Sequence, residues 1–207
     1  MKTLLLTLLL AAATLAADAQ TWLAYNAEGR PAATPYQSPD DLVTVDLPTT
    51  ARKSSRALSF LVQQTSVNLT GGVLGYELEL GASTSAWFPT YTYNGVTIPT
   101  SVRLWFTSSA APYDFKHVND ANQGTYWWSN PLDIDLEDLA LFGPTVLQET
   151  LTDPSRWSSA LGKNGASIPA EFNAAAANSR QIGLSFGGYF FDTGCKVAGG
   201  TATLHVR

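Results

Sequence analysis

The stretch SVRLWFT at positions 101–107 alternates apolar residues with other side chains. Successive side chains of a β-strand point to opposite faces, so Val102, Leu104 and Phe106 would share one face. Arg103 and Trp105 would share the other. The stretch therefore predicts a strand with one face in an apolar core and a second face that carries a guanidinium beside an indole.

The same period of two recurs along the rest of the chain. Alternating apolar residues occupy positions 58–62, 76–80, 182–186 and 202–206. Glycine and asparagine turn signals separate these runs, among them Asn94-Gly95, which favours a two-residue hairpin turn. Many short strands joined by such turns predict an all-β protein, an antiparallel β-sandwich of jelly-roll type over residues 51–207.

Two stretches depart from this rhythm. Residues 20–50 contain four prolines and few alternating runs, which predicts an irregular N-terminal arm that lies across the sandwich. Residues 169–180 begin with proline and contain a run of alanines, so they are predicted to form the one short helix.

The N-terminal residues have the features of an export signal. Lys2 precedes an apolar run at positions 4–10, and Ala17-Asp18-Ala19 fits the small-x-small cleavage rule. Residues 1–19 are therefore predicted to be a signal peptide, and the mature chain is expected to be secreted into the extracellular space or periplasm. The apolar run is too short to span a bilayer comfortably, so no membrane anchor is expected.

Composition narrows the classes of partner. The net charge is −5 and only 14% of the 207 residues are charged. Without a cluster of lysine and arginine, nucleic acid is a poor candidate partner. The single cysteine, Cys195, excludes an intramolecular disulfide. We expect it to be a small, partly buried packing residue, with a disulfide-linked dimer or a reactive thiol as alternatives.

The C-terminal half carries a resemblance to a known family. Its elements are Tyr126-Trp127-Trp128-Ser129-Asn130-Pro131, residues 151–157, Gly162-Lys163, Phe172, residues 182–188, Phe191, Gly194 and residues 200–202. In these the chain resembles the galactose-binding-like, jelly-roll carbohydrate-binding domains of exported bacterial proteins. The resemblance implies a jelly-roll fold and a polysaccharide or glycan partner. Most of the matching residues belong to the scaffold, so the resemblance supports the fold better than any ligand.

The predicted ligand contacts combine ring faces with hydrogen-bond donors. An indole can stack on the apolar face of a sugar while a neighbouring guanidinium donates to its hydroxyls. Small or polar side chains on other strands would line the same groove if these strands share a sheet. The predicted contacts are Arg103, Trp105, Tyr126, Trp127, Trp128, Ser185 and His205. The alternative is that these aromatic rings are structural, with Trp105 covered by the N-terminal arm.

Three functions are weighed. The first is a secreted, non-catalytic carbohydrate-binding protein, and the second is a secreted structural, matrix or cell-surface protein that uses its aromatics only for packing and protein contact. The third is a hydrolase, because the acidic run at 133–138 resembles the Glu-x-Asp-x-Glu strand of family-16 glycoside hydrolases. Asp133 stands where that family has its nucleophilic glutamate, which counts against catalysis. No cofactor is indicated, and a structural Ca²⁺ bound by the acidic run is the one metal hypothesis.

The pair Gly187-Gly188 interrupts the predicted strand at 182–186 just before three aromatic residues. Two glycines in such a place are typical of a bulge or bend. We expect a kink there that redirects residues 189–191; if φ of Gly188 is positive, Gly188→Ala should be destabilising, and ordinary β-region angles would allow alanine at little cost.

Overall fold

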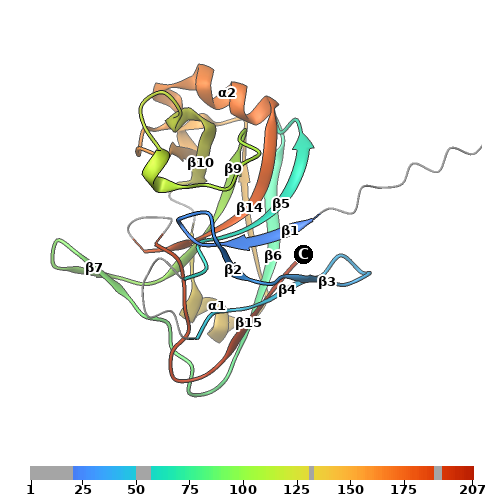
Figure 1. Ribbon diagram of the computed structural model, residues 1–207, viewed down its shortest axis with the longest axis vertical. Coiled ribbons are helices and arrows are strands. Elements are labelled where there is room, and N and C mark those ends of the chain that lie inside the picture. The colour runs from blue at the N-terminus through green and yellow to red at the C-terminus, as the bar shows by residue number, and fades with distance from the viewer. Residues whose placement is uncertain (1–20, 50–56, 131–132, 189–192) are drawn as a thin grey trace, which may run out of the picture.

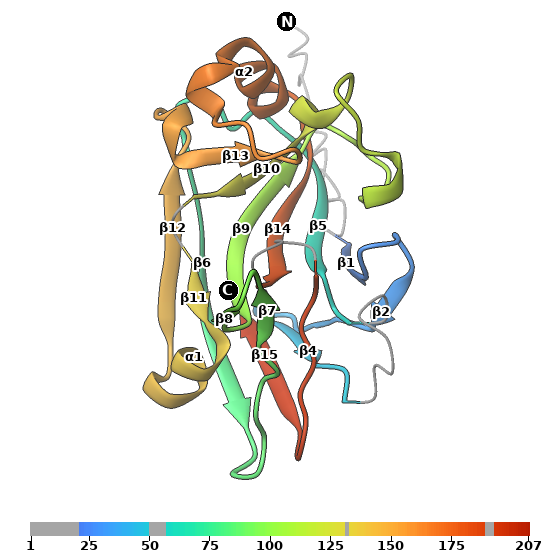
Figure 2. The same ribbon diagram turned by 90° about the vertical axis from the view of Figure 1, so that its left-hand side faces the viewer.

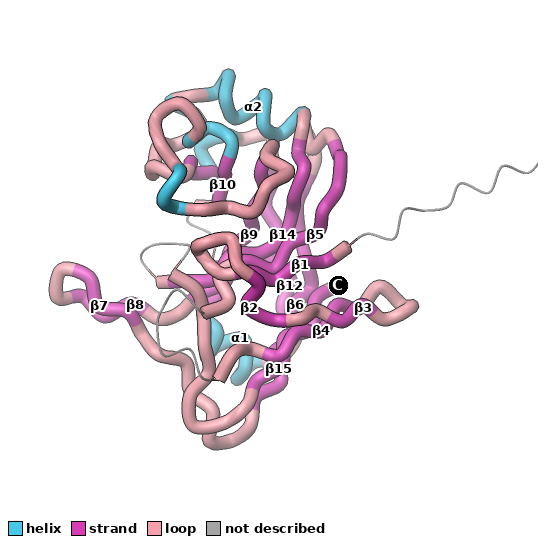
Figure 3. The backbone as a smooth tube through the Cα atoms, viewed as in Figure 1, coloured by secondary structure: helices cyan, strands magenta, loops and turns pink. Residues whose placement is uncertain are grey.

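Two antiparallel β-sheets pack face to face in a β-sandwich (Figures 1 and 2). The computed structural model describes residues 21–49, 57–130, 133–188 and 193–207. Strands dominate these residues and helices are few (Figure 3). The all-β sandwich predicted from the alternating runs is confirmed. The predicted signal peptide at residues 1–19 lies outside the described residues and stays a prediction.

The larger sheet has eight strands. Their order is β13-β10-β9-β14-β5-β1-β2, and β11 pairs with β9. The strands are β1 (Trp22–Tyr25), β2 (Pro31–Ala33), β5 (Phe60–Val67), β9 (Ser101–Thr107), β10 (Tyr126–Ser129), β11 (Ile134–Asp135), β13 (Trp157–Ser159) and β14 (Ser179–Gly187).

The smaller sheet has five strands in the order β12-β6-β15-β4-β3. They are β3 (Tyr36–Gln37), β4 (Val43–Asp46), β6 (Val73–Ala82), β12 (Thr145–Thr150) and β15 (Ala202–Val206). A separate hairpin of β7 (Tyr91–Tyr93) and β8 (Val96–Ile98) extends away from the body (Figure 1). Its turn is Asn94-Gly95, as predicted, with φ of 51° and 78°.

The main core fills the space between the sheets. Val102, Leu104 and Phe106 of β9 are fully buried, and they belong to one apolar cluster with Leu78 of β6 and Leu204 of β15. The period of two therefore gave the inward face of β9 correctly. Burial of this face is the main driving force for the association of the two sheets.

Residues 22–46 are not the irregular arm that the prolines predicted. β1 pairs with β5 in the larger sheet, and β4 pairs with β15 in the smaller one. Pro31 is tolerated because it opens β2, which lies at the edge of its sheet and has one side unpaired. The N-terminal segment thus contributes strands to both layers of the sandwich, which begins well before residue 51.

Two α-helices are present in the described part of the chain. α2 (Pro169–Ala177) is the predicted helix. α1 (Leu136–Phe142) was not predicted, and it replaces most of the acidic strand expected at 133–138. Its inward residues Leu136 and Leu139 are three apart and buried, which is helical spacing inside a run that also fitted a strand. Short 3₁₀ turns cover Phe115–His117, Gln123–Thr125, Pro154–Arg156 and Gly165–Ser167.

The chain bends at Gly188, in agreement with the predicted kink, but without a positive φ. Gly188 is absent from the glycines with positive φ, and β14 ends one residue earlier, at Gly187. A Cβ at Gly188 would lie 2.7 Å from Cδ2 of Tyr91, so the position requires a small residue for packing against that ring. The redirected aromatics at 189–191 fall outside the described residues.

Candidate functional site

Trp105 does not line an open groove. Its side chain is fully buried in a second apolar cluster, on the outer face of the larger sheet. Tyr25 from β1 and Tyr113 from the segment after β9 belong to this cluster, and the rings of Phe60 and Trp105 are 5.1 Å apart. The predicted stacking of a sugar on Trp105 is therefore corrected. The alternative, a structural role for the ring, describes the structure, but the rings nearest to Trp105 are those of Phe60 on β5 and Trp128 on β10 and not those of an N-terminal arm.

The aromatic triplet at the start of β10 divides between the two faces, as strand alternation requires. Trp127 enters the main core, 5.0 Å from the ring of Phe172, and its Nε1 donates to the carbonyl of Gly124 at 2.8 Å. Trp128 and the half-buried Tyr126 pack in the outer cluster. Trp127 and Trp128 are buried, and Tyr126 is half-buried against the outer cluster. Their predicted role as sugar contacts is therefore corrected too.

Arg103 forms an ion pair with Asp133 and a hydrogen bond to the backbone of Ser129. Its Nη2 donates to Oδ2 of Asp133 at 2.8 Å, and its Nη1 donates to the carbonyl of Ser129 at 3.2 Å. Burial lowers the pKa of Arg103, and the nearby carboxylates of Asp133 and Asp135 oppose that shift. Ser185, its neighbour across the strands, is buried with no hydrogen-bond partner for Oγ.

His205 belongs to the other sheet. It lies on β15, between Thr44 of β4 and Glu79 of β6, and its Nδ1 is 3.2 Å from Oγ1 of Thr44. The expected groove shared by His205, Arg103 and Ser185 therefore does not exist, because these residues lie on different layers of the sandwich.

The acidic run forms no catalytic arrangement. Asp133 pairs with Arg103, Asp135 accepts a hydrogen bond from Oγ of Ser101 at 2.8 Å, and Glu137 is exposed in the first turn of α1. The expected common face of Asp133, Asp135 and Glu137 is lost because the strand gives way to a helix at Leu136. Over the described ranges, no three His, Cys, Asp or Glu side chains are grouped so that they could hold a metal ion.

Cys195 is a buried, free thiol. Burial raises its pKa well above the ordinary value. Because the thiolate is the reactive form, the geometry favours the packing role that the sequence suggested.

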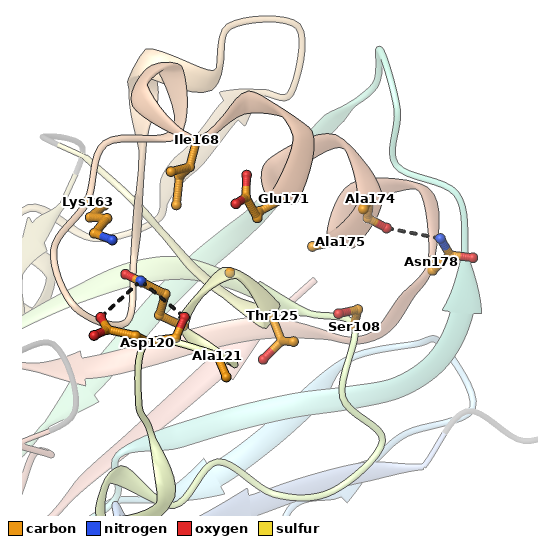
Figure 4. A pocket seen from close by; sticks show the side chains of 12 residues that line it. Ser108, Asp120, Ala121, Thr125, Lys163, Ile168, Glu171, Ala174, Ala175 and Asn178 are labelled. Carbon is orange, nitrogen blue, oxygen red and sulfur yellow. Dashed lines mark hydrogen bonds between the residues drawn. The ribbon is translucent and has the colours of Figure 1, made fainter.

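An open cleft lies at the end of the sandwich where α2 sits (Figure 4). Its volume is about 480 Å³. It is lined by Ser108, Asp120, Ala121, Gln123, Gly124, Thr125, Lys163, Ile168, Glu171, Ala174, Ala175 and Asn178. In Figure 4, α2 and the segment before it form one wall, and the loop that leads into β10 forms the other.

Side-chain caps hold the loop wall in place. The amide oxygen of Asn119 accepts from the backbone N–H of Ala121 at 2.9 Å, and that of Asn122 accepts from the N–H of Asn119 at 2.8 Å. Such local bonds are the reason that asparagine is favoured in turns. They fix the position of Asp120, whose carboxylate accepts from Nε2 of Gln123 at 3.4 Å.

Gly124 brings the two walls together. A Cβ at this position would lie 2.7 Å from Cβ of Glu171, so only glycine allows the loop to approach α2 this closely. Glu171 stands in the first turn of α2, where a carboxylate is favoured by the helix dipole.

Charged groups of both signs line the cleft. Lys163 and Glu171 are exposed, and neither makes an ion pair within the described part of the chain. Carboxylates accept hydrogen bonds, an ammonium donates, and Ser108 and Asn178 add a hydroxyl and an amide. Such a lining can bind a small, hydrated ligand that carries both donors and acceptors.

Sequence analysis did not select these residues. The Asn119-Asp120-Ala121-Asn122 run is a clear turn signal, and Pro169 marks a helix start. Nothing in the sequence shows that segments about forty positions apart form two walls of one cleft.

The comparisons with known proteins gave no match: no family model, no curated protein and no solved structure is similar to this chain. No helix among the described residues is both long enough and apolar enough to cross a membrane.

Proposed function

We propose that this protein is an exported, non-catalytic carbohydrate-binding protein of the galactose-binding-like kind, and that the cleft beside α2 binds a sugar residue. The observation that carries the proposal is the set of polar groups around this cleft, in particular Glu171 and Lys163, which form no ion pair with another described residue, on one wall and the carboxylate of Asp120 on the other.

The size and chemistry of the cleft support a sugar. A volume of about 480 Å³ lies within the range of small-molecule sites. A sugar hydroxyl donates one hydrogen bond and accepts others, so it matches a lining that mixes carboxylate, ammonium, amide and hydroxyl groups. Ile168 adds an apolar contact between Lys163 and Glu171 (Figure 4).

One observation favours a protein-interaction role instead. Leu141 and Phe142, at the end of α1, are 74% and 73% exposed. Adjacent exposed apolar side chains of this size are typical of contact surfaces. A matrix or cell-surface role without sugar binding is therefore the second candidate function.

A binding assay with matched variants tests the proposal. Purified protein lacking residues 1–19 is titrated with a panel of neutral mono- and oligosaccharides, observed by saturation-transfer NMR and calorimetry. Glu171→Gln removes the charge but keeps the shape, and we expect about tenfold weaker binding, because hydrogen bonds to charged groups contribute about 1.5–3 kcal/mol. Glu137→Gln, an exposed carboxylate on α1, is the control and should bind like the wild type.

Two results would contradict the proposal. One is that no sugar in the panel binds at millimolar concentration. The other is that Glu171→Gln and Lys163→Met both bind a sugar as tightly as the wild type, which would place the ligand elsewhere. Self-association that Phe142→Ser abolishes, in a protein that binds no sugar, would favour the interaction role.

A further inference from the structure

The outer face of the smaller sheet is open, unlike that of the larger sheet. On β6 the buried Leu78 and Leu80 alternate with the exposed Glu77, Glu79 and Gly81. β4 and β15 alternate in the same way, so one side of this sheet faces the core and the other faces outward. No aromatic cluster like that around Trp105 covers this side in the described residues.

The register of the strands aligns four side chains in one row across this face. Glu79 of β6 lies opposite His205 of β15, His205 lies opposite Thr44 of β4, and Thr44 lies opposite Tyr36 of β3. Adjacent strands are about 4.8 Å apart, so the row extends over about 14 Å. Tyr36, at one end of the row, is 65% exposed.

A second row runs beside the first. Thr203 of β15 lies between Asp46 of β4 and Gly81 of β6, and its Oγ1 donates to Oδ1 of Asp46 at 2.7 Å. A Cβ at Gly81 would find only one atom within 4 Å, the Thr203 carbonyl at 3.9 Å. The face is therefore flat at this point and leaves space above the backbone.

The charges on this face are mainly negative. Asp46, Glu77 and Glu79 carry carboxylates, and Arg207, whose backbone pairs with that of Glu77, is the cation among them. Like charges would repel a sulfated or uronic polymer and a nucleic acid. An uncharged ligand rich in hydroxyls meets no such penalty.

We propose that this face binds an extended, uncharged polysaccharide chain, with Tyr36 stacking on one sugar and the side chains of His205 and Glu79 hydrogen-bonding to others along the row. This inference rests on the proposed function and adds the ligand's form, a polymer in place of a single sugar. A protein partner fits less well, since the cores of protein interfaces are depleted of charged residues.

Affinity electrophoresis and calorimetry with neutral polymers test the inference. The probes are soluble β-glucan, xylan and galactomannan, the oligosaccharides derived from each, and carboxymethyl cellulose as the charged counterpart. We expect at least one neutral polymer to bind, and Tyr36→Ala and Glu79→Gln each to weaken that binding at least about fivefold and to leave oligosaccharide binding unchanged. Failure of all three neutral polymers to bind would overturn the inference. Tyr93→Ala, an exposed tyrosine on the β7–β8 hairpin, is the matched control and should change neither.

The outcomes separate the two proposals. If oligosaccharide binding depends on Glu171 while Tyr36→Ala behaves like Tyr93→Ala, the inference about the sheet face is wrong and the proposal of a sugar site in the cleft is supported. If polymer binding depends on Tyr36 and not on Glu171, the proposal of a polymer site on the sheet face is supported and the cleft is not the sugar site. Tight binding of carboxymethyl cellulose would overturn the charge argument. Glu79→Gln keeps the strand geometry, so the test remains decisive if Tyr36→Ala fails to fold.

Discussion

Gly183→Ala probes a close backbone approach within the larger sheet. Gly183 lies on β14 between Val62 of β5 and Trp105 of β9. A Cβ there would sit 2.3 Å from the carbonyl oxygen of Leu61 and 2.8 Å from Cα of Val62, and both atoms are backbone. Backbone in the middle of a sheet cannot rotate away as a side chain can, so β14 and β5 would have to separate.

We expect Gly183→Ala to destabilise the fold by about 3 kcal/mol, the upper end of the usual range for overpacking. For a chain of this length that corresponds to a fall in Tm of about 6–12 °C. Gly81→Ala is the matched control, because its Cβ would meet a single atom at 3.9 Å. That substitution should change stability by no more than about 0.5 kcal/mol. Thermal and urea unfolding followed by circular dichroism measure both, and equal Tm values for the two variants would refute the steric reasoning.

Three further predictions concern the buried groups. Trp105→Ala should cost about 3–5 kcal/mol in urea unfolding, because the indole is fully buried, and a cost below 1 kcal/mol would show that it is not. Ser185→Ala should leave stability unchanged or raise it by up to about 1 kcal/mol, since Oγ of Ser185 is buried without a hydrogen-bond partner. Ser129→Ala, whose Oγ accepts from the backbone N–H of Leu104 at 3.1 Å, should instead destabilise, and the opposite order would contradict the hydrogen-bond assignment. Burial raises the pKa of Cys195 above its ordinary value of 9.0 and that of Tyr76 above 10.0, so the unfolded chain loses these protons first. Stability is then fully present below about pH 9 and falls as the pH rises further, more steeply in the wild type than in Cys195→Ala; a Tm that stays constant to pH 11 would disprove it.

The aromatic residues show where reasoning from sequence stopped. Alternation correctly divided Trp127 from Trp128 and Trp105 from its apolar neighbours. It assigned the second face of β9 to a ligand because a strand pattern gives the direction of a side chain and not what lies above it. Tyr25 and Tyr113, which belong to the same outer cluster, come from segments eighty and eight positions away from Trp105. The approach of Tyr25 is a long-range contact that no local pattern indicates, and that of Tyr113 depends on the path of the loop after β9.

The cleft and the open sheet face were missed for a related reason. His205 was selected for the correct property, an outward position on its strand, but it was grouped with residues of the other sheet. Glu171 and Asp120 belong to no motif, and Lys163 entered only as a scaffold match; the three line one cleft because Gly124 lets a loop pack against α2. The strand predicted for the acidic run at 133–138 was wrong for a different reason. Ile134 and Leu136 have the spacing of a strand, and Leu136 and Leu139 have that of a helix, so the apolar residues fitted both.

By itself the sequence determined the fold class, the inward faces of β6, β9, β14 and β15, and the hairpin at Asn94-Gly95, because these depend on the period of the side chains and on backbone preferences of single residues. For β5 the same period gave the wrong face, since Phe60 and Val62 lie in the outer cluster and Leu61 faces the main core. The tertiary structure alone decided which sheet face is covered, which strands are neighbours and which polar groups meet. Those properties arise when segments far apart in the chain bury their apolar surface together, and their free energy is shared among contacts that no short stretch of sequence contains.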